Sequence, residues 1–311
     1  FKKIPTLKIS LTLFQKYKVK EVMGFSFFAY IVMFSNLIIF KTDQIIISMY
    51  STVALAGFYQ IISRITDLFR QFSTQIHDII GPISAALFSS SDQNKLSLVL
   101  LQSNQIVGFV STMLLVPAFL FIEDLLSLWL NINNPQVVLT AKILLVSMYI
   151  LVFLRSSSVQ VLLMCNKHKQ LTTVAIIESL MNLFLSIYLI QYYSIIGVAI
   201  GTLIPNILIA IMYNIPIACK FSGISIVSYV KNTILKNILT GLFVYGILYY
   251  ITQNSVEISF LILIFYFFIS LILFCLIYCM LWISVADRKK AVSLIKNYVL
   301  NKKNLFNIIN V

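Results

Sequence analysis

Residues 57–88 combine a polar and an apolar face on one predicted helix. At about 100° of rotation per residue, the polar face collects two arginines, two aspartates and four other hydrogen-bonding side chains. They are Ser63, Arg64, Asp67, Arg70, Gln71, Thr74, His77 and Asp78. The opposite face carries isoleucine, leucine and phenylalanine. Arginine side chains on such a face suit an anionic ligand, and the aspartates suit ion pairs within the protein.

The spacing of the charges predicts which of them are engaged within the helix. Arg64 and Asp67 are three residues apart, so their side chains can pair along the helix. Arg70 has no acidic residue three or four positions further on, where Thr74 stands instead. We therefore expect Arg70 to bind a partner from elsewhere in the protein or an anionic ligand.

Three further ionisable residues interrupt other apolar segments. Asp43 lies in the first segment near Lys41, Arg155 in the fourth and Glu178 in the fifth. A charged side chain at the centre of a bilayer costs at least about 2.5–3.5 kcal/mol on insertion scales. These groups must therefore line a water-filled cavity or pair within the protein.

Two interpretations of these residues stay open. One is a solvated cavity that handles a polar substrate, and the other is an ion-pair network that only orients the helices. In the first interpretation, six polar residues line the cavity. They are Asp67, Gln71, Thr74, His77, Asp78 and Glu178.

The composition places these charges in a membrane protein. Of the 311 residues, 60% are hydrophobic and only 11% are charged, whereas an average soluble domain carries about 25% charged residues. So few charges cannot cover the surface of a water-soluble globule of this size. The net charge of +13 is typical of basic cytoplasmic loops. We expect no nucleic-acid partner, because no basic stretch carries a recognisable binding module.

Runs of about 20 mostly apolar residues, the length that crosses a bilayer, predict about eight transmembrane helices. They lie near residues 22–49, 57–88, 98–121, 137–164, 171–190, 195–217, 234–252 and 258–284. Most of the 23 lysines and arginines fall in the N-terminal stretch, in alternate connections and in the C-terminal tail. With both termini in the cytoplasm, this topology follows the positive-inside rule. We expect an all-α polytopic transmembrane helix bundle.

The chain divides into three parts on this basis. Residues 1–20 form a basic cytoplasmic segment, residues 21–285 the transmembrane bundle, and residues 286–311 a basic amphipathic cytoplasmic tail. The tail either lies on the anionic inner leaflet or is a frayed basic end. The sequence DLLSLWLN, residues 124–131, predicts a short interfacial helix anchored by Trp129.

Glycines and prolines predict where helices bend or pack closely. The Gly-Pro pair at 81–82 can kink the second helix, and Pro117 and Pro205 lie inside the third and sixth predicted spans. The sequence GVAIG, residues 197–201, places two small residues four apart, which lets helices approach closely.

Motifs for common catalytic chemistry are absent from the sequence. It contains no Walker motif, no HExxH and no GxSxG, which would indicate an ATPase, a metalloprotease or a serine hydrolase. No predicted connection is long enough for a soluble catalytic domain. We therefore expect that the protein is not an enzyme and has neither a cofactor nor a metal site.

The stretch from Lys18 to Leu87 resembles the polysaccharide transporters of the multidrug/oligosaccharidyl-lipid/polysaccharide exporter superfamily, the Wzx-type flippases of O-antigen and capsule units. In that family a helix ending in D-x-I-I-I leads through a short turn into G-x-Y, then a polar helix with basic residues, then a proline. Here these positions are Asp43, Gly57, Tyr59, Arg64, Arg70 and Pro82. The sequences LSLWLN at 126–131 and IIGVAIGTLIPNIL at 195–208 are similar to later family features, so the resemblance covers residues 20–284.

The resemblance implies a transporter of the bacterial cytoplasmic (inner) membrane with 12–14 helices in two pseudo-symmetric bundles. This chain is most similar to the second half of such a transporter. We therefore expect that several N-terminal helices are missing and that this piece alone does not transport.

The resemblance also implies a substrate and a mechanism. Such a flippase exports a polyprenyl-pyrophosphate-linked oligosaccharide by alternating access during lipopolysaccharide or capsule biosynthesis. Arg64, Arg70 and Arg155 are the expected pyrophosphate-binding residues, and Asp43 is the expected site of a coupling proton or sodium ion. The bilayer and other proteins of surface-polysaccharide assembly are the further expected partners.

Other functions stay open. One is a drug/cation antiporter of the same superfamily, whose cavity usually favours acidic groups. Another is a membrane-bound polymerase or acyltransferase of surface polysaccharide, which commonly has a long outer loop or paired catalytic His and Arg residues. A scaffold without transport activity is the last alternative.

Overall fold

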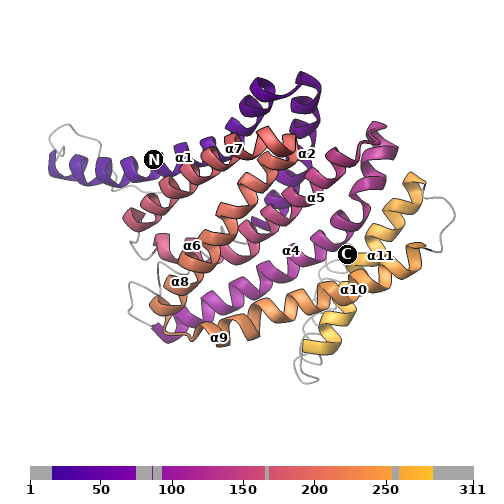
Figure 1. Cartoon of the computed structure of the whole chain (residues 1–311). Helices are drawn as coiled ribbons and strands as arrows, with labels where there is room; N and C mark the ends of the chain where they lie inside the picture. The colour runs from indigo at the N-terminus through magenta and orange to yellow at the C-terminus, as the bar shows by residue number, and fades with distance from the viewer. Residues whose placement is uncertain (1–15, 75–85, 87–92, 165–167, 254–258, 283–311) are drawn as a thin grey trace, which may run out of the picture.

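The computed structural model describes residues 16–74, 86, 93–164, 168–253 and 259–282, and all regular elements within these ranges are helical. The expected all-α bundle is therefore confirmed for this part of the chain (Figure 1). The elements are α1 Lys16–Tyr50, α2 Val53–Thr74, α4 Gln93–Leu130, α5 Pro135–Ile150, η2 Leu151–Ser156, α6 Ser157–Met164, α7 His168–Ile209, η3 Ala210–Asn214, α8 Ile215–Ser222, α9 Ile226–Tyr229, η4 Val230–Ile234, α10 Leu235–Gln253 and α11 Phe260–Trp282. The η elements are single π-helical turns that join neighbouring α-helices end to end.

Six stretches of the described chain are long and apolar enough to cross a membrane. They are Ser26–Tyr50, Ser97–Leu130, Pro135–Gln160, His168–Lys220, Ile226–Gln253 and Phe260–Trp282. They support a multi-pass membrane protein. Helix α2 is not among the six. The total of eight crossings and the cytoplasmic position of both termini remain predictions.

Helix α7 is a tight hairpin of two helices. Ser194 has φ 53° and ψ −137°, which breaks the helix at one residue. Asn182 on the first half reaches Thr202 on the second half, with 3.0 Å between Asn182 Nδ2 and Thr202 Oγ1. The run His168–Lys220 therefore contains two antiparallel helices, which correspond to the separately predicted spans 171–190 and 195–217.

The two glycines of GVAIG allow this close approach, as the sequence predicts. A Cβ on Gly197 would lie 2.2 Å from the carbonyl oxygen of Leu189. A Cβ on Gly201 would lie 2.6 Å from the hydroxyl oxygen of Ser186. Because both contacts are closer than side-chain carbons allow, the hairpin requires glycine at these positions.

The predicted short interfacial helix at 124–131 is wrong, because α4 continues without a break to Leu130. No glycine or proline occurs between Phe121 and Leu130 to end the helix earlier. Asn131 then adopts a left-handed conformation with φ 54°, and its backbone N–H donates to the carbonyl oxygen of Ser127 at 3.0 Å. This pair of features is a common helix C-terminus.

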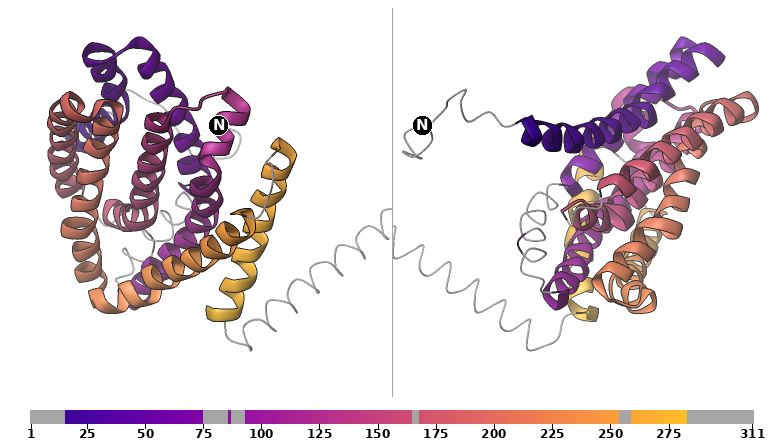
Figure 2. Two further views of the ribbon diagram at one scale, coloured as in Figure 1. Left: turned by 45° about the vertical axis from the view of Figure 1, so that its right-hand side comes forward. Right: turned by 90° about the vertical axis from the view of Figure 1, so that its left-hand side faces the viewer.

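The packing of the helices places α2, α5 and α7 at the centre of one core. Helix α1 lies beside α7, and α5 contacts both α7 and α2. Helices α10 and α11 pack on α4 at one side of the bundle (Figure 2). The largest group of buried apolar residues joins α1, α2, α4, α5 and α7, so polar residues on the inner faces of these helices must meet inside the protein.

The glycine contact in the hairpin predicts a stability difference. Gly197→Ala should destabilise the protein by about 1–3 kcal/mol, because the added carbon overpacks a backbone that cannot give way. Gly246→Ala is the matched control, since a Cβ there meets nothing within 4 Å. We expect Gly246→Ala to keep or raise the midpoint of thermal unfolding in detergent. Equal midpoints for the two variants would contradict the close packing.

Candidate functional site

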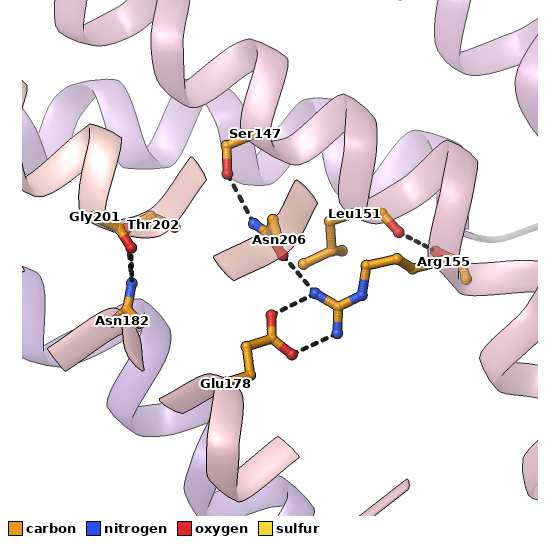
Figure 3. A network of polar contacts seen from close by, with 9 residues as sticks. Ser147, Leu151, Arg155, Glu178, Asn182, Gly201, Thr202 and Asn206 are labelled. Carbon is orange, nitrogen blue, oxygen red and sulfur yellow. Dashed lines mark hydrogen bonds and ion pairs between the residues drawn. The ribbon is translucent and has the colours of Figure 1, made fainter. Parts of the chain in front are cut away.

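Two groups of buried polar side chains lie one helical turn apart between α1, α2, α5, η2 and α7. The Asp43 cluster consists of Asp43, Tyr59, Asn182 and Thr202. The Arg155 network consists of Ser147, Arg155, Glu178 and Asn206 and is drawn in Figure 3. Glu178 precedes Asn182 by one turn, and Asn206 follows Thr202 by one turn, so the two halves of α7 contribute to both groups.

Asp43 is almost fully buried, with 3% of its surface exposed. The Tyr59 hydroxyl donates a hydrogen bond to Asp43 Oδ2 at 2.6 Å. The hydroxyl of Thr202 lies 3.2 Å from the same oxygen, and Asn182 Nδ2 donates to Thr202 Oγ1 at 3.0 Å. The cluster therefore joins α1, α2 and both halves of α7 through one carboxylate oxygen.

The second carboxylate oxygen of Asp43 and the amide oxygen of Asn182 have no partner among the described residues. Asp43 Oδ1 and Asn182 Oδ1 are buried and accept no hydrogen bond from the described residues. A cavity of about 20 Å³ adjoins Asp43 and Thr202 and extends to Lys41 and Arg64 on the polar side of α2. That volume is about the size of one water molecule.

The chemistry of these groups suits a proton or a small hard cation. A carboxylate, an amide oxygen and a hydroxyl are the kinds of ligand that such cations prefer. A proton on Asp43 would instead neutralise a buried charge. No group of three or more His, Cys, Asp or Glu residues that could hold a metal ion occurs in the described ranges.

Arg155 and Glu178 form a buried ion pair. Arg155 Nη1 donates to Glu178 Oε1, and Nη2 donates to Oε2 at 2.6 Å. Only 14% of the Arg155 side chain and 4% of the Glu178 side chain are exposed. Arg155 also donates to Asn206 Oδ1, and Asn206 Nδ2 donates to Ser147 Oγ at 2.8 Å (Figure 3).

This pairing bears on two predictions from the sequence, in which Arg155 binds substrate and Glu178 lines a cavity. The folded hairpin places the Glu178 carboxylate opposite the π-helical turn that carries Arg155. The bidentate geometry engages both terminal nitrogens of the guanidinium, whereas Arg155 Nε has no partner among the described residues. A role of either residue at a substrate site stays a prediction.

The expected pairing on α2 is wrong. Asp67 Oδ1 accepts hydrogen bonds from Arg70 Nε and Nη2, each at 3.3 Å. Asp67 lies three residues before Arg70, so the two side chains share one face of the helix and can pair. Arg64 is exposed and forms no hydrogen bond or ion pair with the described residues.

Of the remaining predicted cavity-lining residues, only some fall within the described chain. Gln71 lies on α2 and is exposed. The side chain of Thr74 and all of His77, Asp78 and Pro82 lie outside the described residues.

A larger cavity of about 360 Å³ lies between α1 and α2. Its charged lining consists of Lys41, Asp67 and Arg70, and its other lining residues are Val32, Met33, Asn36, Leu37 and Phe40. The guanidinium carbon of Arg70 lies 5.6 Å from the centre of the Phe40 ring. This cavity therefore combines two cationic groups and one carboxylate with an apolar wall.

On the apolar side of α2, a groove of about 570 Å³ separates α2 and α4 from α11. Apolar residues line it throughout. They are Ile65, Leu68, Phe69, Leu114, Pro117, Ala118, Phe121, Ile122, Leu125, Leu263, Ile264, Phe267 and Phe268. Because α2 forms one wall of both spaces, the cationic cavity and the apolar groove lie on either side of one helix.

Several site residues were not singled out from the sequence. Thr202 and Asn206 bond directly to Asp43 and Arg155. Asn182 and Ser147 bond in turn to Thr202 and Asn206. A signal for two of them was present, because Asn182 follows Glu178 by four residues and Asn206 follows Thr202 by four. Polar residues four apart in an apolar helix share a face.

Comparisons with protein-family models, curated proteins and solved structures find no match to this chain. The function therefore has to be argued from the site itself.

The buried ion pair predicts a large effect of removing one partner. Glu178→Gln should destabilise the protein by about 3–5 kcal/mol, because it leaves the Arg155 charge buried without a counter-ion. The double substitution Arg155→Met with Glu178→Leu should recover much of this loss.

The solvent-accessible ion pair of Lys142 and Glu123 is the matched control, with 3.6 Å between Lys142 Nζ and Glu123 Oε2. Glu123→Gln should cost less than about 1 kcal/mol, because the Glu123 side chain is 68% exposed. Thermal unfolding in detergent measures all three variants. An effect of Glu178→Gln no larger than that of Glu123→Gln would show that Arg155 is solvated.

Proposed function

We propose that this chain is part of a flippase or exporter that moves a polyprenyl-pyrophosphate-linked oligosaccharide across the bacterial cytoplasmic membrane by alternating access. The observation that carries the proposal is the cavity between α1 and α2, which joins two cationic side chains to an apolar wall. A lipid-linked pyrophosphate has the matching chemistry, with an anionic group attached to a hydrocarbon chain.

The charges around this cavity favour an anion. Lys41 and Arg70 outnumber Asp67 in its lining, and Arg64 lies on the same helix within the adjoining small cavity. The pairing of Asp67 with Arg70 leaves the pair neutral and Lys41 and Arg64 in excess. Phosphate oxygens bind such groups through charge-assisted hydrogen bonds.

The apolar groove on the other side of α2 suits the hydrocarbon part of the same substrate. Its lining offers no side-chain hydrogen-bonding group, so a polyprenyl chain there would contact carbon only. An oligosaccharide could not be accommodated in the groove without losing its hydrogen bonds to water.

The acidic residues weigh against the alternative of a drug/cation antiporter. Asp67 and Glu178 are already paired with Arg70 and Arg155, so they do not offer a free negative charge to a cationic drug. Asp43 is buried in a space of about 20 Å³, which is too small for a drug molecule. We assign Asp43 the role of holding the coupling proton or sodium ion.

The anionic ligand gives the first test of the proposal. Arg70→Gln should weaken binding of farnesyl pyrophosphate by about tenfold, the loss expected for one charge-assisted contact of about 1.5 kcal/mol. Lys142→Gln is the matched control, because it removes a cation that pairs with Glu123 and does not line the α1–α2 cavity. Binding is measured by native mass spectrometry of the purified chain in detergent.

Farnesol, which lacks the pyrophosphate, separates the outcomes. Equal affinities for farnesol and farnesyl pyrophosphate would contradict an anionic substrate. Preferential binding of a lipophilic cation such as tetraphenylphosphonium would favour the antiporter alternative.

The role of Asp43 gives a second test. Asp43→Asn should abolish export of lipid-linked oligosaccharide while leaving the protein folded, because asparagine keeps the shape and the bond from Tyr59 but cannot take up a proton or neutralise a cation. Export is measured in intact cells as oligosaccharide exposed at the outer surface, with thermal unfolding as the check on folding. Wild-type export by Asp43→Asn would refute the coupling role.

A further inference from the structure

A third set of buried polar side chains lies where α4 meets α6, η3, α9 and α10. We call it the asparagine cluster, and its members are Asn104, Ser158, Asn214, Tyr229 and Asn237. Each of them is at most 1% exposed. None of these side chains ionises at neutral pH, so the cluster differs in kind from the Asp43 cluster and the Arg155 network.

Most amide atoms of the three asparagines lack a partner among the described residues. Five of them accept or donate no hydrogen bond there. They are Asn104 Nδ2 and Oδ1, Asn214 Nδ2 and Oδ1, and Asn237 Oδ1. Buried groups of this kind are normally paired, because losing their bonds to water costs free energy that nothing else returns.

The members of the cluster have neighbours in common on and around α4. Tyr229 belongs to the same buried apolar group as Leu100, Cys219 and Ile215, the residue after Asn214, and its hydroxyl interacts with that of Ser158. Asn104 lies one turn after Leu100 and one turn before Gly108. A Cβ on Gly108 would lie 2.6 Å from Asn237 Nδ2.

Three π-helical turns end or begin at this cluster. Ser158 follows η2 by two residues, Asn214 is the last residue of η3, and Tyr229 immediately precedes η4. π-helical turns within α-helices are rare and occur frequently at functional sites. They are also places where a helix can bend, and all three lie beside members of the cluster.

We propose that the asparagine cluster is an internal water site that opens to the aqueous phase when α8 and α9 move away from α4. Neutral amides and hydroxyls match water as donors and acceptors, and they offer no charge to an ion. If the core were permanently closed, leucine side chains at these positions would give a more stable protein than unpaired amides do. The polar atoms are therefore explained if water reaches them in an open state.

The thiol of Cys219 reports on this opening, because Cys219 is 1% exposed and contacts Tyr229 of the cluster. The full chain with Cys165→Ser, Cys275→Ala and Cys279→Ala keeps only this thiol. A water-soluble methanethiosulfonate should modify it at least about tenfold faster than the thiol introduced by Ala141→Cys in a chain that also carries Cys219→Ala. Ala141 is equally buried, within the apolar core around α5.

Substitutions within the cluster test its role directly. Asn104→Leu with Asn214→Leu should slow modification of Cys219 by at least about tenfold, because the open state no longer gains bonds to water. Ser270→Ala is the matched control, since the hydroxyl of Ser270 on α11 is also buried with no hydrogen-bond partner in the described part of the chain. We expect this control to leave the rate unchanged.

Two results would overturn the proposal. One is modification of Cys219 no faster than of the thiol introduced by Ala141→Cys, and this comparison needs no change within the cluster. The other is an unchanged rate in the folded Asn104→Leu, Asn214→Leu protein, or in Asn214→Leu alone if the double variant does not fold. The outcome is independent of the transported substrate.

Discussion

The burial of charge in an apolar bundle is the constraint on which the arrangement of the core depends. Arg155 and Glu178 can be buried because their bidentate ion pair offsets much of the free energy that each charge loses on leaving water. That contact requires α7 to fold back on itself and η2 to face it. The same hairpin brings Asn182 and Thr202 to Asp43. One geometric requirement thus fixes the positions of α1, α2, α5 and α7 together.

The charges of the described residues lie in two different environments. The Arg155–Glu178 pair is enclosed in the interior. By contrast, Arg64 and Lys41 are exposed, and Arg70 with Asp67 lines an open space between α1 and α2. The bidentate contact therefore accounts for the interior charges, while Lys41, Arg64 and Arg70 border spaces at the α1–α2 surface.

The sequence was informative wherever periodicity decides the structure. Helical spacing identified the two faces of α2, and the small residues at 197 and 201 predicted a close contact that the hairpin contains. Hydropathy could not predict the partners of a charge, because these depend on which helices become neighbours. Arg155 and Glu178 are 23 residues apart in the sequence, so no helical spacing links them. The continuation of α4 to Leu130 was missed because Trp129 and the acidic residues resemble a boundary between lipid and water.

The turn at Ser194 has a consequence for motion. A single residue connects the two halves of α7, and glycine contacts close to it hold them together. The short connection and the close contacts restrict relative motion of the two halves, so Asn182 and Thr202 keep a fixed spacing. A change in the surroundings of Asp43 then requires α1, which carries Asp43, or α2, which carries Tyr59, to shift relative to α7.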